Sequence, residues 1–346
     1  MSRLPSSATK RIGAPTPKHF ALVLVIGLVL LGICLLASLA FGSRVVRFHD
    51  VIDGLFFPDI DSLEANIVRK RISRTVFGLF CGVALGISGS LMQSVTRNPI
   101  ADPSILGVNT GAALFVVIGS AFLGIGSAGE YIWLALVGAA LTALFVYGIG
   151  SMGRGGATPI KLVLAGAATS AALASLIGAI LIPRAYVMDQ FRFWQVGSVG
   201  AANWDFIALF APFLIVGVAI AFIAAPALNA MALGDEVATG LGVRTGVLRL
   251  IAAFAGVILC GAATALAGPI GFVGLLATHA MRLVLGPDLR YVIPMSALSG
   301  AIILTVSDVI GRLIGSPGEL EVGVVTAFVG APILILLAMR SKVRSL

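Results

Sequence analysis

Long, uninterrupted apolar stretches run through this sequence, and they constrain its fold more than any other feature. Ten of them follow one another, each with few or no charged residues. The hydrocarbon core of a bilayer is about 30 Å thick, and roughly 20 apolar helical residues cross it. The chain is 59% hydrophobic and 11% charged, whereas soluble domains are about 45–50% apolar and about a quarter charged. The sequence therefore predicts an all-α, polytopic membrane protein and excludes disordered and nucleic-acid-binding chains.

The ten stretches give the boundaries of ten predicted transmembrane helices. They cover residues 20–41, 72–92, 105–125, 131–149, 161–182, 206–225, 247–267, 270–285, 291–310 and 322–339. Each run is continuous rather than alternating, which favours helices over the strands of a β-barrel. A transmembrane domain is thus expected at 20–339, between tails at 1–19 and 340–346. Only Gly268 and Pro269 separate the seventh and eighth helices, so these two are expected to form a tight hairpin.

The first stretch has two interpretations. Basic residues precede it, and Ser38-Leu39-Ala40 resembles a small-x-small cleavage site, so a signal peptide that is removed is one of them. However, the stretch exceeds the usual 7–15-residue apolar region of a signal peptide. We therefore expect a retained first helix.

The charges indicate the orientation of the chain. An even number of helices places both termini on one side, and the positive-inside rule, applied to a net charge of +8, places them in the cytoplasm. Six basic residues then lie on the outer side, between or at the ends of the first two helices: Arg44, Arg47, Arg69, Lys70, Arg71 and Arg74. Either the acidic residues of the same segment dilute this charge, or an acidic partner binds at the outer face.

Small residues also follow a pattern. Gly78, Gly82 and Gly86 recur every four residues in the second predicted helix. Such a stripe lets two membrane helices approach closely, so this face is predicted to pack against another helix.

The motifs of common enzymes are missing from the sequence. Its three histidines are scattered, no HExxH or GxSxG motif occurs, and none of its five lysines follows a glycine as in a P-loop. The chain is therefore not expected to be an enzyme, to hold a metal or to hydrolyse ATP itself. Asp308 precedes Arg312 by one helical turn, which predicts a local ion pair rather than a proton relay.

Two predicted cytoplasmic segments interrupt the apolar pattern. In the first, Pro99 and Pro103 forbid a continuous helix and predict a rigid turn. In the second, at 228–243, four apolar residues are spaced as one helical face: Leu233, Val237, Ala238 and Leu241. Gly234 and Gly242 bracket them and are expected to break the helix on either side. A short helix of this kind is typical of docking into a partner's groove, or of lying on the membrane interface.

Several longer motifs are specific to one class of membrane protein. They include RISRTVFGLFCGVALGISGSLMQSV, RNPIADPSILGVN, FRFWQVGS, ALNAMALGDEVATGLGV, GPIGFVGLLATHAMRLVLGPDLR and ELEVGVVTAFVGAPILI. In these motifs the chain resembles the permeases of the iron-siderophore, haem and vitamin B12 class of bacterial ABC importers. The resemblance covers nearly the whole chain, and RNPIADPSILGVN and FRFWQVGS are most similar to the ferric-enterobactin type.

This resemblance implies a ten-helix permease of a type II ABC importer in the inner (plasma) membrane, which carries a ferric siderophore by alternating access. Its implied partners are a second permease in a heterodimer, two ATPase subunits that use ATP and Mg, and an extracytoplasmic binding protein. The permease itself would bind no cofactor. A permease for vitamin B12 or haem is an alternative, and an ion-coupled secondary transporter that needs no ATPase is another.

The resemblance also implies roles for individual residues. Docking of the binding protein is expected at Arg71, Arg74 and Arg312, and a cytoplasmic gate at Asn98, Ile100 and Thr158. The residues expected to couple the chain to the ATPase are Leu233, Gly234, Asp235, Glu236, Val237, Ala238, Leu241 and Gly242.

A possible substrate entrance rests on chemistry rather than on the resemblance. Arg184 and Arg192 lie near Phe191 and Trp194 in the sequence, at the outer end of the fifth predicted helix. Ferric catecholates carry negative charge and aromatic rings, which such side chains would attract. Anchoring at the membrane interface, where arginines and aromatic residues are common, is the alternative.

Overall fold

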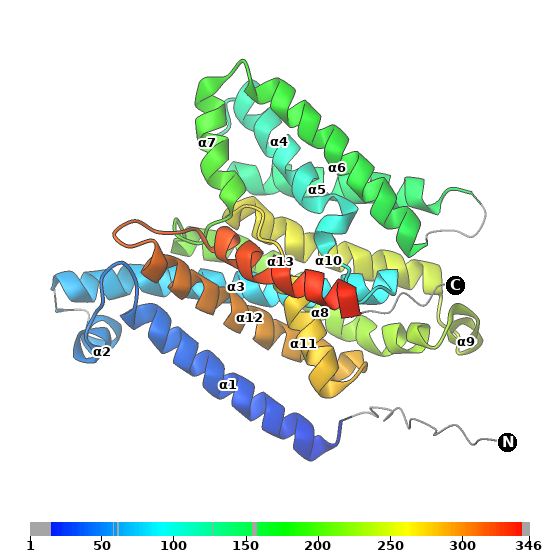
Figure 1. Ribbon diagram of the computed structural model, residues 1–346, viewed down its shortest axis with the longest axis horizontal. Coiled ribbons are helices and arrows are strands. Elements are labelled where there is room, and N and C mark those ends of the chain that lie inside the picture. The colour runs from blue at the N-terminus through cyan, green and yellow to red at the C-terminus, as the bar shows by residue number, and fades with distance from the viewer. Residues whose placement is uncertain (1–14, 58, 61, 127, 154–157, 341–346) are drawn as a thin grey trace.

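The computed structural model describes residues 15–57, 59–60, 62–126, 128–153 and 158–340, and Figure 1 shows their arrangement. In chain order the elements are α1 (Pro17–Ala40), α2 (Phe48–Phe56), α3 (Leu63–Thr96), the 3₁₀ turn η1 (Pro103–Leu106), α4 (Val108–Phe122), α5 (Ala128–Ser151), α6 (Pro159–Leu181), α7 (Ala185–Val196), α8 (Trp204–Ala232), α9 (Asp235–Gly240), α10 (Thr245–Ala267), α11 (Val273–Leu285), α12 (Leu289–Ile314) and α13 (Val322–Arg340). The regular structure of this described part is entirely helical, as predicted. The two predicted tails lie largely outside the described residues.

Each of the ten predicted stretches coincides with a helix. Within the described residues, seven of these helices are long and apolar enough to cross a membrane: α1, α3, α5, α6, α8, α10 and α12. The other three, α4, α11 and α13, are shorter apolar helices. The polytopic architecture is therefore confirmed, whereas ten complete crossings are not. The sequence did not predict α2 and α7.

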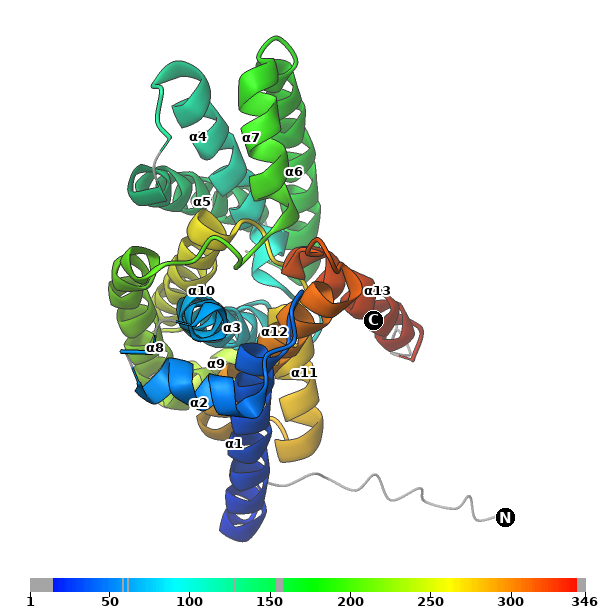
Figure 2. The same cartoon turned by 90° about the vertical axis from the view of Figure 1, so that its left-hand side faces the viewer.

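Helix α3 forms the centre of the bundle. In Figure 2 it is seen nearly end-on, with α8, α10 and α12 around it. In its apolar 18-residue stretch, 78% of the residues are buried, whereas only 6% are buried in that of α1, although α1 is the most hydrophobic of the seven long helices. Apolar side chains on the outside are stable when lipid rather than water surrounds the protein, so α1 has the surface of a lipid-facing helix.

The predicted glycine stripe brings α3 and α12 into close contact. A Cβ on Gly82 would lie 2.5 Å from the carbonyl oxygen of Gly300 and 2.6 Å from the Cα of Ala301. Gly86 lies in the same way against the backbone of Ser296. Gly78 does not belong to this contact, because a Cβ there would meet only a side-chain methyl of Val199 at 3.9 Å. The prediction is thus confirmed for two of the three glycines.

The expected hairpin of the seventh and eighth helices is wrong. Five residues, 268–272, connect α10 to α11, and α11 packs against α3 and α12 instead (Figure 1). Gly268 and Phe272 both have positive φ, at 73° and 68°. Gly274 then lies against Gly89 of α3, well inside the bundle. With 13 residues, α11 is about 20 Å long, so it covers only part of the depth that the longer helices span.

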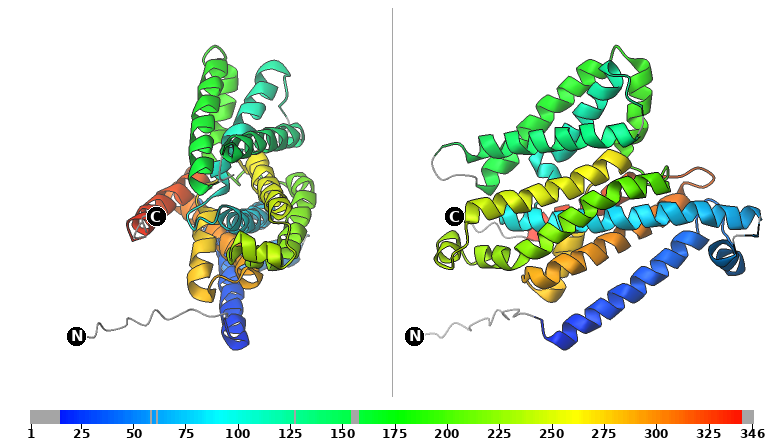
Figure 3. Two further views of the ribbon diagram at one scale, coloured as in Figure 1. Left: turned by 90° about the vertical axis from the view of Figure 1, so that its right-hand side faces the viewer. Right: turned by 180° about the vertical axis from the view of Figure 1, so that it is seen from behind.

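The bundle has two ends, which carry the candidate sites. The end of α1, the start of α3 and the end of α12 meet at one of them, called here the Arg74 end. The end of α3, α9 and the starts of α10 and α12 meet at the other, called the Asp235 end. The right-hand view of Figure 3 shows α9 and α2 at opposite ends, and α4, α6 and α7 leaning away from the main bundle as a lateral group.

Candidate functional site

At the Arg74 end, one carboxylate holds two arginines from different helices. Asp308 of α12 accepts hydrogen bonds from Nε and Nη2 of Arg74 in α3, at 3.1 and 2.7 Å. Its other oxygen lies 3.0 Å from Nη2 of Arg312, one turn further along α12. Arg74 also reaches Glu319 in the connection between α12 and α13. The cluster joins α3, α12 and this connection into one unit.

The carbonyl groups at the end of α1 complete this cluster. The last carbonyls of a helix have no partners within it, and cations are favourable there. Arg71 donates to Leu39 and Ala40 at 2.8 and 3.1 Å, and Arg312 donates to the Ser38 carbonyl oxygen at 2.9 Å. Two buried guanidinium groups thereby bind the C-terminal end of α1 to α3 and α12.

Helix α7 separates two cavities beside the lateral group. The cavities have volumes of about 340 and 390 Å³, and both are lined by Phe191 and Trp194. These two rings stack with centroids 5.7 Å apart, and the indole N–H of Trp194 donates to the carbonyl of Ala265 at 3.2 Å. The second cavity also contains Asn109 and Gln195, so its wall is partly polar.

At the Asp235 end, a carboxylate again joins separate elements. Asp235, the first residue of α9, accepts hydrogen bonds from Arg97 at the end of α3 and from Arg249 of α10, the latter at 2.8 and 2.9 Å. Arg97 also donates to the Met231 carbonyl of α8 at 2.7 Å. A movement of α9 would therefore pull on both α3 and α10.

A second carboxylate holds the start of α12. Asp288 accepts from Asn229 of α8 at 2.6 Å and from the side chain of Arg290 at 2.7 Å. The hydrogen bonds from Arg290 are the main cause that keeps the pKa of Asp288 below its ordinary value. Asp288 therefore remains ionised, and it connects α8 to α12 through charge-assisted bonds.

The comparisons with known proteins agree with this helical architecture. The model of the FecCD transport family matches residues 30–340. The chain belongs to the FecCD transport family. It is therefore a transport permease rather than a catalytic enzyme, and a multi-pass membrane protein.

Known iron-transport permeases are similar to this chain over almost their whole length. The ferric enterobactin transport system permease protein FepD of Escherichia coli is 43% identical over 315 residues, which are 90% of this chain and 93% of that protein. The Fe(3+)-citrate import system permease protein YfmD of Bacillus subtilis is 38% identical over 335 residues, 97% of this chain and 98% of that protein.

Solved structures share the fold. A metal-chelate type ABC transporter in an inward-facing conformation superimposes with a TM-score of 0.79 at 24% identity, over 93% of this chain and 99% of that one. PsaBC from Streptococcus pneumoniae, solved in complex with a Fab, gives a TM-score of 0.57 at 16% identity, over 84% of this chain and 95% of that one. These likenesses support the ABC permease fold.

The three arginines expected to dock a binding protein lie together in this FecCD permease, but not as expected. Arg71 and Arg312 are buried, and Arg74 is largely buried and paired with two carboxylates. A soluble partner contacts exposed charge, and in this arrangement the three guanidinium groups offer little of it; the docking role stays a prediction. The expected ion pair of Asp308 and Arg312 is confirmed. The sequence did not predict the involvement of the end of α1, where the last carbonyl groups need hydrogen-bond donors from other helices.

The expected coupling segment needs two corrections. Residues 228–232 continue α8, so the connection starts only at Leu233. Ala238 is fully buried and does not belong to the exposed apolar face, which consists of Leu233, Val237 and Leu241. The expected breakers are confirmed, since Gly234 and Gly242 have φ of 118° and 83° on either side of α9.

The three residues expected to form a gate all occur at breaks in helices. Asn98 follows the left-handed end of α3 and its side chain accepts from the backbone N–H of Ile100 at 3.1 Å. Thr158 is the N-cap of α6 and accepts from the N–H of Lys161 at 3.4 Å. These are local turns and caps, and the gating role stays a prediction.

The residues expected at a substrate entrance are only partly available. Phe191 is buried, and Arg184 lies over the ring of Phe122, 4.5 Å from its centroid. Arg192 is exposed and forms a loose ion pair with Asp189 at 3.7 Å. Arg192 is therefore the most exposed residue of this group, whereas Trp194 is half-buried and lines both cavities beside α7.

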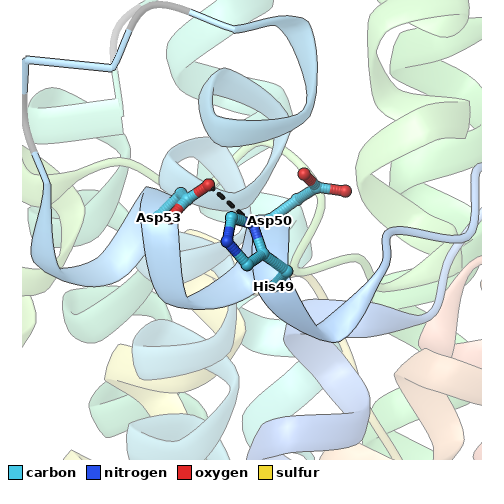
Figure 4. Close-up of side chains that lie close together, drawn as sticks. All are labelled: His49, Asp50 and Asp53. Carbon is cyan, nitrogen blue, oxygen red and sulfur yellow. Dashed lines mark ion pairs between the residues drawn. The ribbon is translucent and has the colours of Figure 1, made fainter.

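One further group was not singled out from the sequence. His49, Asp50 and Asp53 of α2 each place one possible ligand atom within 4.8 Å of the others, and His49 pairs with Asp53 at 3.0 Å (Figure 4). The sequence signal for this pair is the spacing of four residues between His49 and Asp53, which makes them neighbours on one helix face. The group is partly exposed, and an ion pair of this kind needs no metal to explain it.

Proposed function

We propose that the chain is a permease subunit of an ATP-dependent importer for ferric siderophores and forms half of the translocation pathway. The observation that carries this proposal is the 43% identity with a ferric enterobactin permease over 90% of the chain. We further propose that all ten apolar helices belong to the membrane domain, that the membrane is the inner (plasma) membrane, and that both termini are cytoplasmic.

The proposed partners fit the two ends of the bundle. The Asp235 end is assigned to the cytoplasm, where two ATPase subunits that use ATP and Mg would contact α9. The exposed apolar side chains of Leu233, Val237 and Leu241 support this, because an apolar helix face can bind in a groove of a partner protein. A second, homologous permease would complete the pathway. Secondary transport by the chain alone has no comparable support, since the acidic residue of α12, Asp308, is fully occupied by arginines.

The Arg74 end is assigned to the binding protein. The exposed basic residues there are Arg44, Arg47 and Lys70. We propose that these side chains meet acidic residues of the binding protein, while Arg71, Arg74 and Arg312 hold the underlying helices in place. Docking should then weaken as salt rises, because exposed charges are screened.

A gate is proposed where the turn after α3 approaches the cytoplasm. Asn98 fixes this turn through its bond to Ile100, and Ile100 is partly exposed. Alternating access would move this turn together with α6, which Thr158 caps.

The proposed entrance is tested at Arg192. If its guanidinium attracts an anionic ferric catecholate, Arg192→Ala should raise the KM of uptake with little change in maximal rate, because an encounter interaction is lost. Arg192→Lys, which keeps the charge, serves as the matched control. Uptake by Arg192→Ala that equals the wild type would assign Arg192 to membrane anchoring.

Iron uptake by cells tests the proposed cargo. Cells that lack this chain should fail to accumulate radioactive iron supplied as a ferric siderophore, and the wild-type chain should restore accumulation. Vitamin B12 and haem, supplied separately, show whether the cargo is another compound of the same importer class. Normal siderophore uptake without the chain would contradict the proposal.

A further inference from the structure

A polar cavity lies at the Asp235 end, between α3, α8 and α11. Its volume is about 230 Å³. The polar residues on its wall are Gln93 and Ser94 of α3, Arg97 just beyond that helix, and Arg282 of α11. This cavity is separate from the exposed face of α9 and from the cavities beside α7.

Gln93 is a buried amide without a partner. Its side chain lines the cavity, the residue is only 2% exposed, and neither Nε2 nor Oε1 has a hydrogen-bond partner among the described residues. Burying an amide without hydrogen bonds is unfavourable, and most buried polar atoms in proteins have a partner. The unused donor and acceptor of Gln93 therefore indicate an occupant.

Arg282 is a partly buried cation without a counter-charge. Its Nη2 donates to the hydroxyl of Ser94 at 3.1 Å, and its buried Nε has no partner. No carboxylate among the described residues forms an ion pair with it. Two acidic residues at this end are engaged elsewhere, Asp235 by Arg97 and Arg249, and Asp288 by Arg290.

The donors around the cavity define the charge of the occupant. Arg282 supplies N–H groups and Gln93 an amide N–H₂, and Arg97, whose charge is paired with Asp235, also borders the cavity. A cation would be repelled, and a neutral molecule would leave Arg282 without a counter-charge. Oxyanions accept several such bonds at once, and arginine forks match phosphate oxygens particularly well.

We propose that this cavity binds a phosphate group, carried either by a phospholipid headgroup or by a soluble phosphate. The position fits both sources, because the cavity lies at one end of the bundle and the adjoining Leu283 and Val284 of α11 expose apolar side chains. The phosphate compensates Arg282 and accepts from the amide of Gln93. The inference does not depend on which cargo the permease carries.

Thermal unfolding of the full chain in a neutral detergent tests the proposal. Inorganic phosphate and, separately, short-chain phosphatidylglycerol are titrated against sodium chloride of equal ionic strength. We expect a saturable rise in Tm. A response to phosphatidylglycerol alone identifies a lipid headgroup, and a response to inorganic phosphate alone identifies a soluble source. No rise with either probe overturns the proposal.

Substitutions test whether the rise in Tm comes from phosphate binding in this cavity. Arg282→Gln should weaken the apparent affinity about tenfold or more, since it removes charge-assisted bonds. Gln93→Glu places a carboxylate in the cavity, so it should raise the basal Tm and remove the response to phosphate. This second variant keeps the test valid if Arg282→Gln does not fold. Arg244→Gln, at an exposed arginine of the same end that does not line the cavity, is the control and should respond as the wild type does.

The variants also separate phosphate from a protein partner. A response that persists in both Arg282→Gln and Gln93→Glu would contradict the site. If Arg282→Gln lost co-purification with the ATPase while its response to phosphate stayed unchanged, the occupant would be an acidic side chain of that partner, and the proposal would be wrong.

Discussion

Arg312 lies between a carboxylate on its own helix and the carbonyl groups that end α1. It is 1% exposed, and its guanidinium contacts Asp308, Ser38 and Phe41. Removing one partner of such a buried set leaves the others without compensation, which generally costs more than the pair contributes. This residue therefore contributes to the stability of the helix arrangement.

Replacing Arg312 tests this structural role. Arg312→Ala should lower the free energy of unfolding by about 3 kcal/mol or more, because Asp308 and the end of α1 lose their donor. Thermal unfolding of the full chain in detergent measures the change. Arg192→Ala, at an exposed arginine, should leave Tm within error of the wild type. A stable Arg312→Ala that only loses the binding protein would instead support direct docking.

The sequence was informative about this residue only in part. The four-residue spacing of Asp308 and Arg312 predicted their ion pair. The contact of Arg71 and Arg312 with α1 joins residues more than thirty and more than two hundred and seventy positions apart, and no local pattern reveals such a pairing. A basic residue at a helix end has the same appearance in the sequence whether it is exposed or caps another helix.

At the scale of elements, the packing of α3 on α12 depends on the absence of side chains. Gly82→Ala places a Cβ 2.5 Å from the carbonyl oxygen of Gly300, so the two backbones must separate. We expect a loss of about 1–3 kcal/mol, as for other overpacked contacts. Gly32→Ala in α1, where a Cβ would meet nothing within 4 Å, is the matched control. Equal Tm values for the two variants would show that this contact is not tight.

The exposed face around α9 gives a second prediction at this scale. Leu241→Ser should reduce co-purification with the ATPase, because it removes an apolar contact from the proposed docking face. Leu123→Ser, at the end of α4, is the control, since Leu123 is 64% exposed and Leu241 is 65% exposed. Equal recovery of the ATPase with both variants would exclude this face from the interface.

Helices with strong apolar patterns were predictable, and their interruptions were not. All ten stretches became helices, because each is long and uniformly hydrophobic. The entry of 268–272 into the bundle depends on the positive φ of Gly268 and Phe272 and on the contact of Gly274 with Gly89. These are tertiary features. Likewise, the spacing of Ala238 suits an exposed face, but contact with neighbouring helices buries it.

At the scale of the whole molecule, the distribution of charge is more informative than its total. At each end one carboxylate joins arginines of different helices: Asp308 binds Arg74 and Arg312, and Asp235 binds Arg97 and Arg249. Apolar side chains cover the outer helices, as expected in lipid. A permease built in this way has two polar ends on which other subunits can act and a middle in which helices pack in close contact.

Transport by purified components tests the central claim most directly. The chain is reconstituted in liposomes with its partner permease, the ATPase subunits and the binding protein, and the uptake of a ferric siderophore is measured. We predict uptake that requires ATP and every subunit, and no uptake by this chain alone under a proton or sodium gradient. Uptake by the chain alone under such a gradient, or equal uptake without ATP, would contradict the account.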